Sequence, residues 1–283
     1  MPRFYPALEI CWSNPPGQEF LEELLAAVDD EAPLAVEDML AGQRIFFAST
    51  ESRDRAIELV KALAPHYAVA SLDISDEDWA ERSQASLEPV RVGGFVVVPG
   101  KDLGGRTTTS EVIFINPSMG FGTGHHASTR LCLNLMQQIP LARTAVLDVG
   151  TGSGILAIAA RKLGAAIVVA IEPDADALQS ARENCETNGV QDTVDLRDVD
   201  LGRAAIALGR AFELVLANLT GALIARHARV LSGLTADGGR LIASGFQIYE
   251  ADDVAGALED VGLRVAQRIE EEGWVGLVTQ RQP

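Results

Sequence analysis

The stretch that decides the fold of this chain is Ala145-Val-Leu-Asp-Val-Gly-Thr-Gly-Ser-Gly-Ile-Leu-Ala-Ile-Ala-Ala160. An apolar run, glycines at three alternate positions and a run of helix-forming residues predict a buried strand, a tight turn and a helix. Glycines have no Cβ, so the turn can approach a bound ligand closely. Glu172 ends the next apolar run, where its carboxylate could accept hydrogen bonds from two ribose hydroxyls. The stretch therefore predicts a pocket for an adenosine-bearing cofactor.

The spacing of the glycines favours one such cofactor over another. A dinucleotide fingerprint is G-x-G-x-x-G, with a pyrophosphate at the N-terminus of the helix. Here Gly150, Gly152 and Gly154 give G-x-G-x-G, directly after Asp148. A carboxylate at that position would repel a pyrophosphate but tolerates a cationic sulfonium, so S-adenosylmethionine fits better than NAD. A glycine-rich turn that serves only the strand-to-helix geometry is the less favoured interpretation.

Length and composition exclude several classes of protein. A chain of 283 residues suits one or two domains. No apolar run approaches the roughly 18 residues of a membrane span, and the N-terminus lacks the apolar core of a signal peptide. Three scattered cysteines, Cys11, Cys132 and Cys185, indicate neither a disulfide framework nor a zinc site. We therefore expect a cytoplasmic protein.

The charge of the chain is strongly negative and uneven. The net charge is -17, and residues 1–100 carry 18 acidic and 7 basic side chains. Solubility accounts for much of this charge. A sharper interpretation is that the N-terminal part attracts a basic protein. Nucleic acid is disfavoured as the main partner, because phosphate neutralisation needs lysine and arginine.

The pattern of the N-terminal part predicts a small ferredoxin-like α+β domain over residues 1–74. Its order β-α-β-β-α-β is typical of that domain. The expected strands span 7–12, 34–37, 44–48 and 67–74, and the expected helices span 18–28 and 53–63. Residues 75–88 then predict a linker helix with Ser75 as its N-cap.

Residues 89–283 predict a doubly wound α/β domain with a seven-stranded, mostly parallel sheet. Strands and helices alternate along this part of the chain. We expect strands at 95–98 and 112–115, followed by a loop and a helix at 128–138. The alternating part then has strands at 145–149, 167–172, 194–196, 213–217 and 240–243, and helices at 155–163, 175–188, 220–234 and 249–261. Residues 263–269 and 274–279 flank a turn, so the last strand should run antiparallel. This arrangement is typical of S-adenosylmethionine-dependent methyltransferases.

Two further segments are expected beside the cofactor, because ligands of such sheets bind beyond the carboxyl ends of the strands. Asn218 follows an apolar strand, where it could hold an incoming amine with its lone pair towards the transferred methyl group. The alternative role is an N-cap of the next helix. The loop Phe121-Gly-Thr-Gly-His-His-Ala-Ser-Thr-Arg130 suggests a flap, from which Thr129 or Ser128 could reach the methionine moiety. Its adjacent histidines present two ligands to one ion poorly, so no metal is expected.

With these sites in hand, the chain resembles the ribosomal protein L11 methyltransferase family over nearly its whole length. The motifs that carry the resemblance are Asp78-Trp79, Pro89-Val-Arg-Val-Gly-Gly, Phe121-Gly-Thr-Gly-x-His, the glycine core, Asn184-x-x-x-Asn188-Gly-Val, Ala217-Asn218-Leu219, Ser244-Gly245 and Trp274. The glycine core alone would indicate only a methyltransferase, whereas the Phe-Gly-Thr-Gly-x-His loop is far more specific.

The resemblance implies a substrate-recognition domain joined flexibly to a methyltransferase domain. It implies methylation of lysine side chains and of the N-terminal amine of a basic ribosomal protein, with Thr129, Gly150, Glu172 and Asn218 at the cofactor. The chain departs from the usual family motif at His125, Ala127 and Thr220, near the approach to the methyl group, and Ser83 stands where a second tryptophan is common.

Several alternatives stay open at this point. A methyltransferase of the same fold could act on another basic protein or on a small molecule. A NAD-dependent oxidoreductase is disfavoured by the glycine spacing and by Asp148. A non-catalytic scaffold that binds the cofactor is disfavoured by Asn218 and the loop before it.

Overall fold

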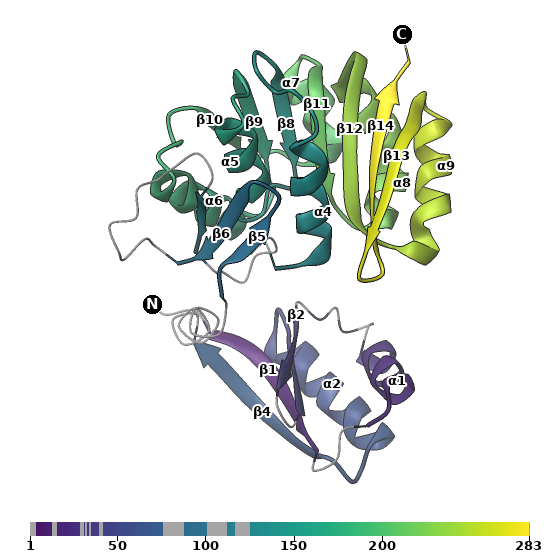
Figure 1. Ribbon diagram of the computed structural model, residues 1–283. Helices are drawn as coiled ribbons and strands as arrows, with labels where there is room; N and C mark the ends of the chain where they lie inside the picture. The colour runs from purple at the N-terminus through teal and green to yellow at the C-terminus, as the bar shows by residue number, and fades with distance from the viewer. Residues whose placement is uncertain are drawn as a thin grey trace. The chain divides into compact units, whose positions relative to one another are not determined.

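The computed structural model divides the chain into two compact units, Met1–Arg82 and Ser83–Pro283 (Figure 1). The division falls within the segment predicted as a linker. The structure describes residues 4–12, 16–28, 31, 33, 35–39, 42–75, 88–100, 112–116 and 125–282. The predicted linker helix therefore lies outside the described residues except at its two ends, and so does the Phe121-Gly-Thr-Gly124 part of the loop.

The first unit contains a four-stranded antiparallel sheet and two helices. Its elements are β1 (Phe4–Cys11), α1 (Gln18–Val28), β2 (Ala35–Met39), β3 (Gly42–Phe46), α2 (Thr50–Leu63) and β4 (Ala68–Ser75). The sheet order is β2-β3-β1-β4, and every neighbouring pair is antiparallel. This is the predicted β-α-β-β-α-β arrangement, with Leu24, Val28 and Val60 of the helices buried against the sheet.

The second unit is built around a seven-stranded sheet. Its strands are β8 (Ala145–Val149), β9 (Ile167–Ile171), β10 (Val194–Arg197), β11 (Phe212–Asn218), β12 (Thr235–Gln247), β13 (Leu263–Glu271) and β14 (Trp274–Arg281). Their order is β10-β9-β8-β11-β12-β14-β13. Strands β8 to β12 pair in parallel, whereas β14 is antiparallel to both β12 and β13. The predicted terminal hairpin and its antiparallel strand are confirmed.

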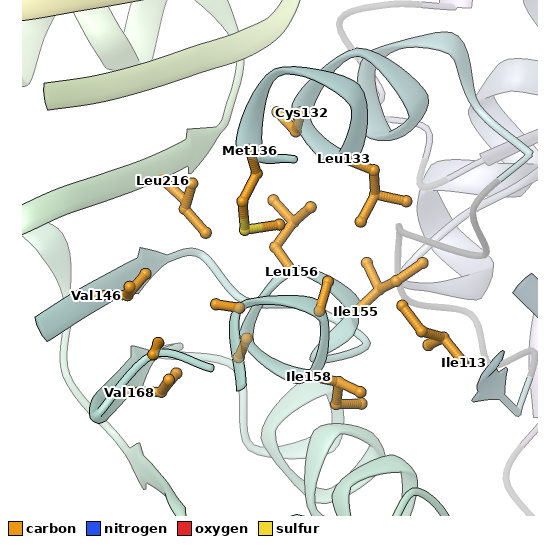
Figure 2. Close-up of a cluster of buried hydrophobic side chains, with 14 of the residues drawn as sticks. Ile113, Cys132, Leu133, Met136, Val146, Ile155, Leu156, Ile158, Val168 and Leu216 are labelled. Carbon is orange, nitrogen blue, oxygen red and sulfur yellow. The ribbon is translucent and has the colours of Figure 1, made fainter. Parts of the chain in front are cut away.

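Helices cover both faces of this sheet. On one face lie α4 (Ala127–Met136), α5 (Ile155–Lys162) and α6 (Ala175–Thr187); on the other lie α7 (Leu201–Leu208), α8 (Gly221–Leu234) and α9 (Ala251–Glu259). Alternate residues of a strand point to opposite faces. Each face of the sheet has its own hydrophobic core: the first lies under α4, α5 and α6, and the second under α7, α8 and α9. Val146 accordingly belongs to the first core, beside Leu156 and Met136 (Figure 2), whereas Leu147 belongs to the second.

A separate three-stranded sheet precedes the large one in the chain. It consists of β5 (Val90–Val92), β6 (Phe95–Pro99) and β7 (Val112–Ile115). Strand β6 is antiparallel to β5 and parallel to β7. Ile113 of β7 packs near Ile155 of α5 (Figure 2), so this sheet extends the first core.

Several elements differ from the sequence expectation, and strand β5 was not predicted. The helix predicted over 249–261 begins only at Ala251, because Ile248–Glu250 form a 3-10 turn, η2, with Glu250 accepting from the Gln247 amide. Strand β12 starts at Thr235, well before the predicted residue 240, and runs through Gly238 and Gly239. Helix α7 was not predicted, since it is short and contains a glycine. No described helix has both the length and the apolar character to cross a membrane.

Candidate active site

The residues predicted to bind the cofactor meet at one edge of the large sheet. Strands β8, β9, β11 and β12 are parallel, so their carboxyl ends lie at the same edge. Gly150 follows β8, Glu172 follows β9, and Asn218 ends β11. This is the edge at which open α/β sheets bind ligands.

The glycine loop has the backbone conformation that requires glycine. The φ angles of Gly150, Gly152 and Gly154 are 67°, 52° and 83°, in a region that residues with a Cβ occupy at a cost. A Cβ on Gly150 would lie 2.6 Å from Leu219 Cδ2. The glycine loop therefore packs directly against the segment that follows Asn218.

Glu172 is held in place by the loop that it faces. Its Oε2 accepts from the Gly152 amide at 3.0 Å, and its Oε1 accepts from the Asp174 amide at 3.2 Å. A carboxylate has about four acceptor positions, so two remain for further donors. The side chain is thus fixed without being saturated, as a carboxylate that binds ribose hydroxyls must be.

Asp148 lies beneath the glycine loop, only 1% exposed. Its Oδ2 accepts from Thr151 Oγ1 at 2.6 Å and from the Ala157 amide at 3.1 Å. Burial raises the pKa of this carboxyl to about 7, although both hydrogen bonds lower it, and the charge of Glu172 raises it further. Asp148 therefore ties the loop to the first turns of α5 from inside the protein.

Asn218 and Thr129 are brought together although 89 positions separate them in the chain. Asn218 Nδ2 donates to Thr129 Oγ1 at 3.2 Å, and the Thr129 side chain is buried. Asn218 Oδ1 is also buried, yet no donor of the described residues reaches it. A buried acceptor without a donor is costly and calls for an explanation. The site therefore offers an acceptor to a group that the described residues do not supply.

The alternative role of Asn218, as the N-cap of the following helix, is wrong. Thr220 caps α8, because its side chain accepts from the Leu223 amide at 3.4 Å. The segment between them is fixed by the neighbouring strand, since the Leu219 amide donates to Ser244 O at 2.9 Å. A Cβ on Gly245 would lie 2.5 Å from Leu219 O, so only glycine fits there.

The two histidines of the loop have different neighbours. His125 Nε2 lies 2.8 Å from Glu88 O, whereas His126 Nδ1 lies 2.8 Å from Ser128 Oγ and caps α4. The His126 ring meets the Trp274 ring edge-on, with centroids 4.3 Å apart. Burial lowers the pKa of His126, and the charge of Arg130 lowers it further. Within the described ranges, no three His, Cys, Asp or Glu side chains are grouped to hold a metal ion.

Two asparagines at the end of α6 support the site: Asn184 lies within the helix and Asn188 is its C-cap. From the sequence alone they were only part of a motif. Asn184 Nδ2 donates to Ser153 O of the glycine loop at 2.8 Å, and its Oδ1 accepts from the Asn116 amide at 2.8 Å. Asn188 pairs with both backbone groups of Phe114 in β7. Their spacing of four on the buried face of a helix was the available signal. They join β7 to the glycine loop.

The fold and the site define a class I S-adenosylmethionine-dependent methyltransferase. The chain belongs to the ribosomal protein L11 methyltransferase family: the family model "Ribosomal protein L11 methyltransferase (PrmA)" matches residues 27–282.

Relatives and a solved structure agree with this assignment. The ribosomal protein L11 methyltransferase of Pelotomaculum thermopropionicum is 41% identical over 237 residues, which are 82% of this chain and 76% of that protein. That of Cupriavidus pinatubonensis is 32% identical over 269 residues, 91% of this chain and 88% of that protein. The crystal structure of a ribosomal protein L11 methylase from Lactobacillus delbrueckii subsp. bulgaricus superposes with a TM-score of 0.63 at 27% identity, covering 70% of this chain and all of that one.

The described residues fit S-adenosylmethionine. Glu172 keeps acceptor positions for the ribose, and the glycine loop approaches it through the Gly152 amide. The Glu172 carboxylate makes this edge favourable for a sulfonium cation and unfavourable for a pyrophosphate. The acceptor atom of Asn218 lies at the end of β11, the strand that pairs with β8, and beside Thr129.

Proposed function

We propose that this methyltransferase transfers methyl groups to lysine side-chain amines of ribosomal protein L11, and to its N-terminal amine. The single observation that carries the proposal is the buried Oδ1 of Asn218, which lacks a donor among the described residues. An amine N–H can donate the hydrogen bond that this oxygen is able to accept. The names of the relatives supply the identity of the protein substrate.

The proposed reaction is a direct in-line displacement at the methyl carbon: the bond to the amine nitrogen forms as the bond to the sulfonium sulfur breaks, and S-adenosylhomocysteine leaves. Bound at the glycine loop, S-adenosylmethionine supplies an already electrophilic methyl group. Lysine must first lose its ammonium proton to bulk water, which burial in a weakly polar cleft favours by lowering the lysine pKa. Asn218 Oδ1 then accepts from the amine N–H, so that the nitrogen lone pair points at the methyl group. Thr129 fixes the orientation of the amide by accepting from Nδ2, and orientation supplies much of the acceleration.

The two units have separate roles in this proposal. Residues 1–74 recognise the substrate protein, and residues 75–88 link the units. Residues 89–283 bind the cofactor, which is contacted by Thr129, Gly150, Gly152, Glu172 and Asn218. The 18 acidic residues among the first 100 favour a basic protein over nucleic acid. Cys11, Cys132 and Cys185 are all free thiols, which suits the reducing cytoplasm.

Mass spectrometry of purified large-subunit ribosomal proteins tests this proposal. The proteins are incubated with the enzyme and S-adenosylmethionine, and each is weighed and then fragmented. We expect additions of methyl mass on ribosomal protein L11 alone, at lysine residues and the N-terminus. Methyl groups on another basic protein would overturn the proposed substrate. So would the absence of methyl groups on every protein while calorimetry shows cofactor binding. Neither result would contradict the methyltransferase fold.

A further inference from the structure

Exposed apolar side chains of the second unit gather beside the site. Among its described residues, five large apolar side chains are exposed: Ile167, Ile206, Leu223, Ile248 and Tyr249. Single exposed apolar residues are normal on a protein surface. Three of these five, however, belong to the segments that directly follow β11 and β12. Ile248 is 44% exposed and Tyr249 is 78% exposed, next to each other in η2.

The structure holds these segments firmly together. The Ile248 amide donates to Gly273 O at 3.0 Å, which ties η2 to the turn between β13 and β14. A Cβ on Gly221 would lie 2.6 Å from Glu250 Oε1, so η2 also packs on the first turn of α8, the turn that contains Leu223. The exposed side chains therefore occupy a fixed surface.

This surface adjoins the reacting edge. Strand β12 pairs with β11 so that Ser244 lies opposite Asn218, and η2 begins directly after β12 ends. Leu223 lies in the first turn of α8, which Thr220 caps. Both segments therefore leave the sheet at the edge where Asn218 lies.

The charge around this surface is negative. Six carboxylates lie in or next to η2 and the β13–β14 turn, namely Glu250, Asp252, Asp253, Glu270, Glu271 and Glu272. Two guanidinium groups pair with them: Arg268 with Asp252 and Glu270, and Arg130 with Glu271 and Glu272. The excess of negative charge suits a basic polypeptide and repels phosphate-bearing partners.

We propose that Leu223, Ile248 and Tyr249 form a docking surface for the segment of the substrate protein that flanks the amine to be methylated. The apolar side chains bury against that segment, and the surrounding carboxylates attract its basic side chains. Tyrosine is among the residues that contribute most to such contacts. This inference rests on the proposed function, and it adds a contact on the methyltransferase unit to recognition by the first unit.

Steady-state kinetics of the full-length protein with ribosomal protein L11 test the surface. We expect Tyr249→Ala to raise the KM for ribosomal protein L11 about tenfold, the effect of a moderate interface contact. Ile248→Ala should raise the KM in the same direction. The kcat and the Kd of S-adenosylmethionine, measured by calorimetry, should stay unchanged, because neither side chain is part of the cofactor site. Ile206→Ala is the matched control, since Ile206 is 91% exposed on α7 of the same unit.

The outcomes separate the two proposals. If the wild-type enzyme methylates ribosomal protein L11 and Tyr249→Ala leaves its KM unchanged, the docking surface is wrong and the proposed function stands. A KM that rises together with the cofactor Kd would also overturn the surface, because it indicates a change in the fold. If the wild-type enzyme does not methylate ribosomal protein L11, the proposed function fails and the inference fails with it.

Discussion

The two polar atoms of the Asn218 side chain are in different situations. Nδ2 donates to Thr129 Oγ1, whereas Oδ1 is buried without a donor among the described residues. In this orientation of the amide, the contact with Thr129 uses Nδ2 and leaves Oδ1 as the acceptor. The second atom is then available for the substrate in one defined direction.

Asn218→Ala should therefore affect turnover more than cofactor binding. Loss of an oriented polar group in an active site lowers kcat by on the order of 10²-fold or more. We expect the Kd of S-adenosylmethionine, measured by calorimetry, to change only a few-fold, because Gly152 and Glu172 are untouched. Equal losses in kcat and in cofactor affinity would place Asn218 in cofactor binding alone.

Asp148 should make the stability of the protein depend on pH. Its pKa is raised from 3.8 to about 7 by burial, so between these values the folded chain holds a proton that the unfolded chain has released. This stabilising contribution is full below about pH 4 and is lost as the pH rises to about 7, with a slope of at most ~1.4 kcal/mol per pH unit.

The measurement is the free energy of unfolding in urea at pH 5, 6 and 7, for wild type and Asp148→Asn. The amide keeps an acceptor for Thr151 and Ala157 but does not titrate. As the pH rises, we expect the free energy of unfolding of the wild type to fall relative to that of the variant. Parallel curves would show that the Asp148 carboxyl has the same pKa in the folded and unfolded chain.

At the scale of elements, α6 connects parts of the second unit that are distant in the chain. Asn188, the C-cap of α6, hydrogen-bonds to both the N–H and the C=O of Phe114 in β7. A neighbouring strand would make the same pair of hydrogen bonds. Asn184 does the same for one backbone group of the glycine loop and one of Asn116. The end of this helix thus fixes β7 and Asn116 relative to the cofactor loop.

Asn188→Ala should lower the free energy of unfolding by about 2 kcal/mol, because it leaves two buried backbone groups of Phe114 without partners. The control is Glu183→Ala on the exposed face of the same helix, where the expected change is within about 0.5 kcal/mol. Urea denaturation of both variants measures the difference. If the two variants lose the same stability, β7 does not depend on the Asn188 pairing.

Local patterns in the sequence were sufficient for most elements and for the position of the candidate site residues at one edge of the sheet. Glycine spacing and the position at the end of a strand identified Gly150, Glu172 and Asn218, because parallel strands bring their carboxyl ends together whatever the rest of the chain does. The pairing of His126 with Trp274 and of Asn184 with Ser153 joins residues far apart in the chain. No local pattern contains such contacts. Helix α9 was predicted too long because η2 continues its apolar pattern.

At the scale of the whole molecule, the two units have separate hydrophobic cores. The buried residues of the first unit cluster among themselves, from Leu8 to Val60, and those of the second form two clusters on either side of the large sheet. A unit with its own core can fold by itself. Cofactor binding and substrate recognition should therefore be separable by truncation.

The fragment 83–283 should bind S-adenosylmethionine with the affinity of the full-length protein and lose most activity on ribosomal protein L11. Calorimetry measures the first property, and methyl transfer followed by mass spectrometry measures the second. A fragment that binds the cofactor and methylates ribosomal protein L11 as fast as the whole protein would remove the proposed role of residues 1–74.

The position of β14 has a consequence for synthesis of the protein. This strand follows β13 in the chain but lies between β12 and β13 in the sheet. A ribosome releases β13 before β14, so the nascent chain exposes the open edge of β12 and an unpaired β13 until β14 emerges. Exposed strand edges invite pairing with other chains. We therefore expect wrong pairing of the nascent chain mainly between the release of β13 and the release of β14.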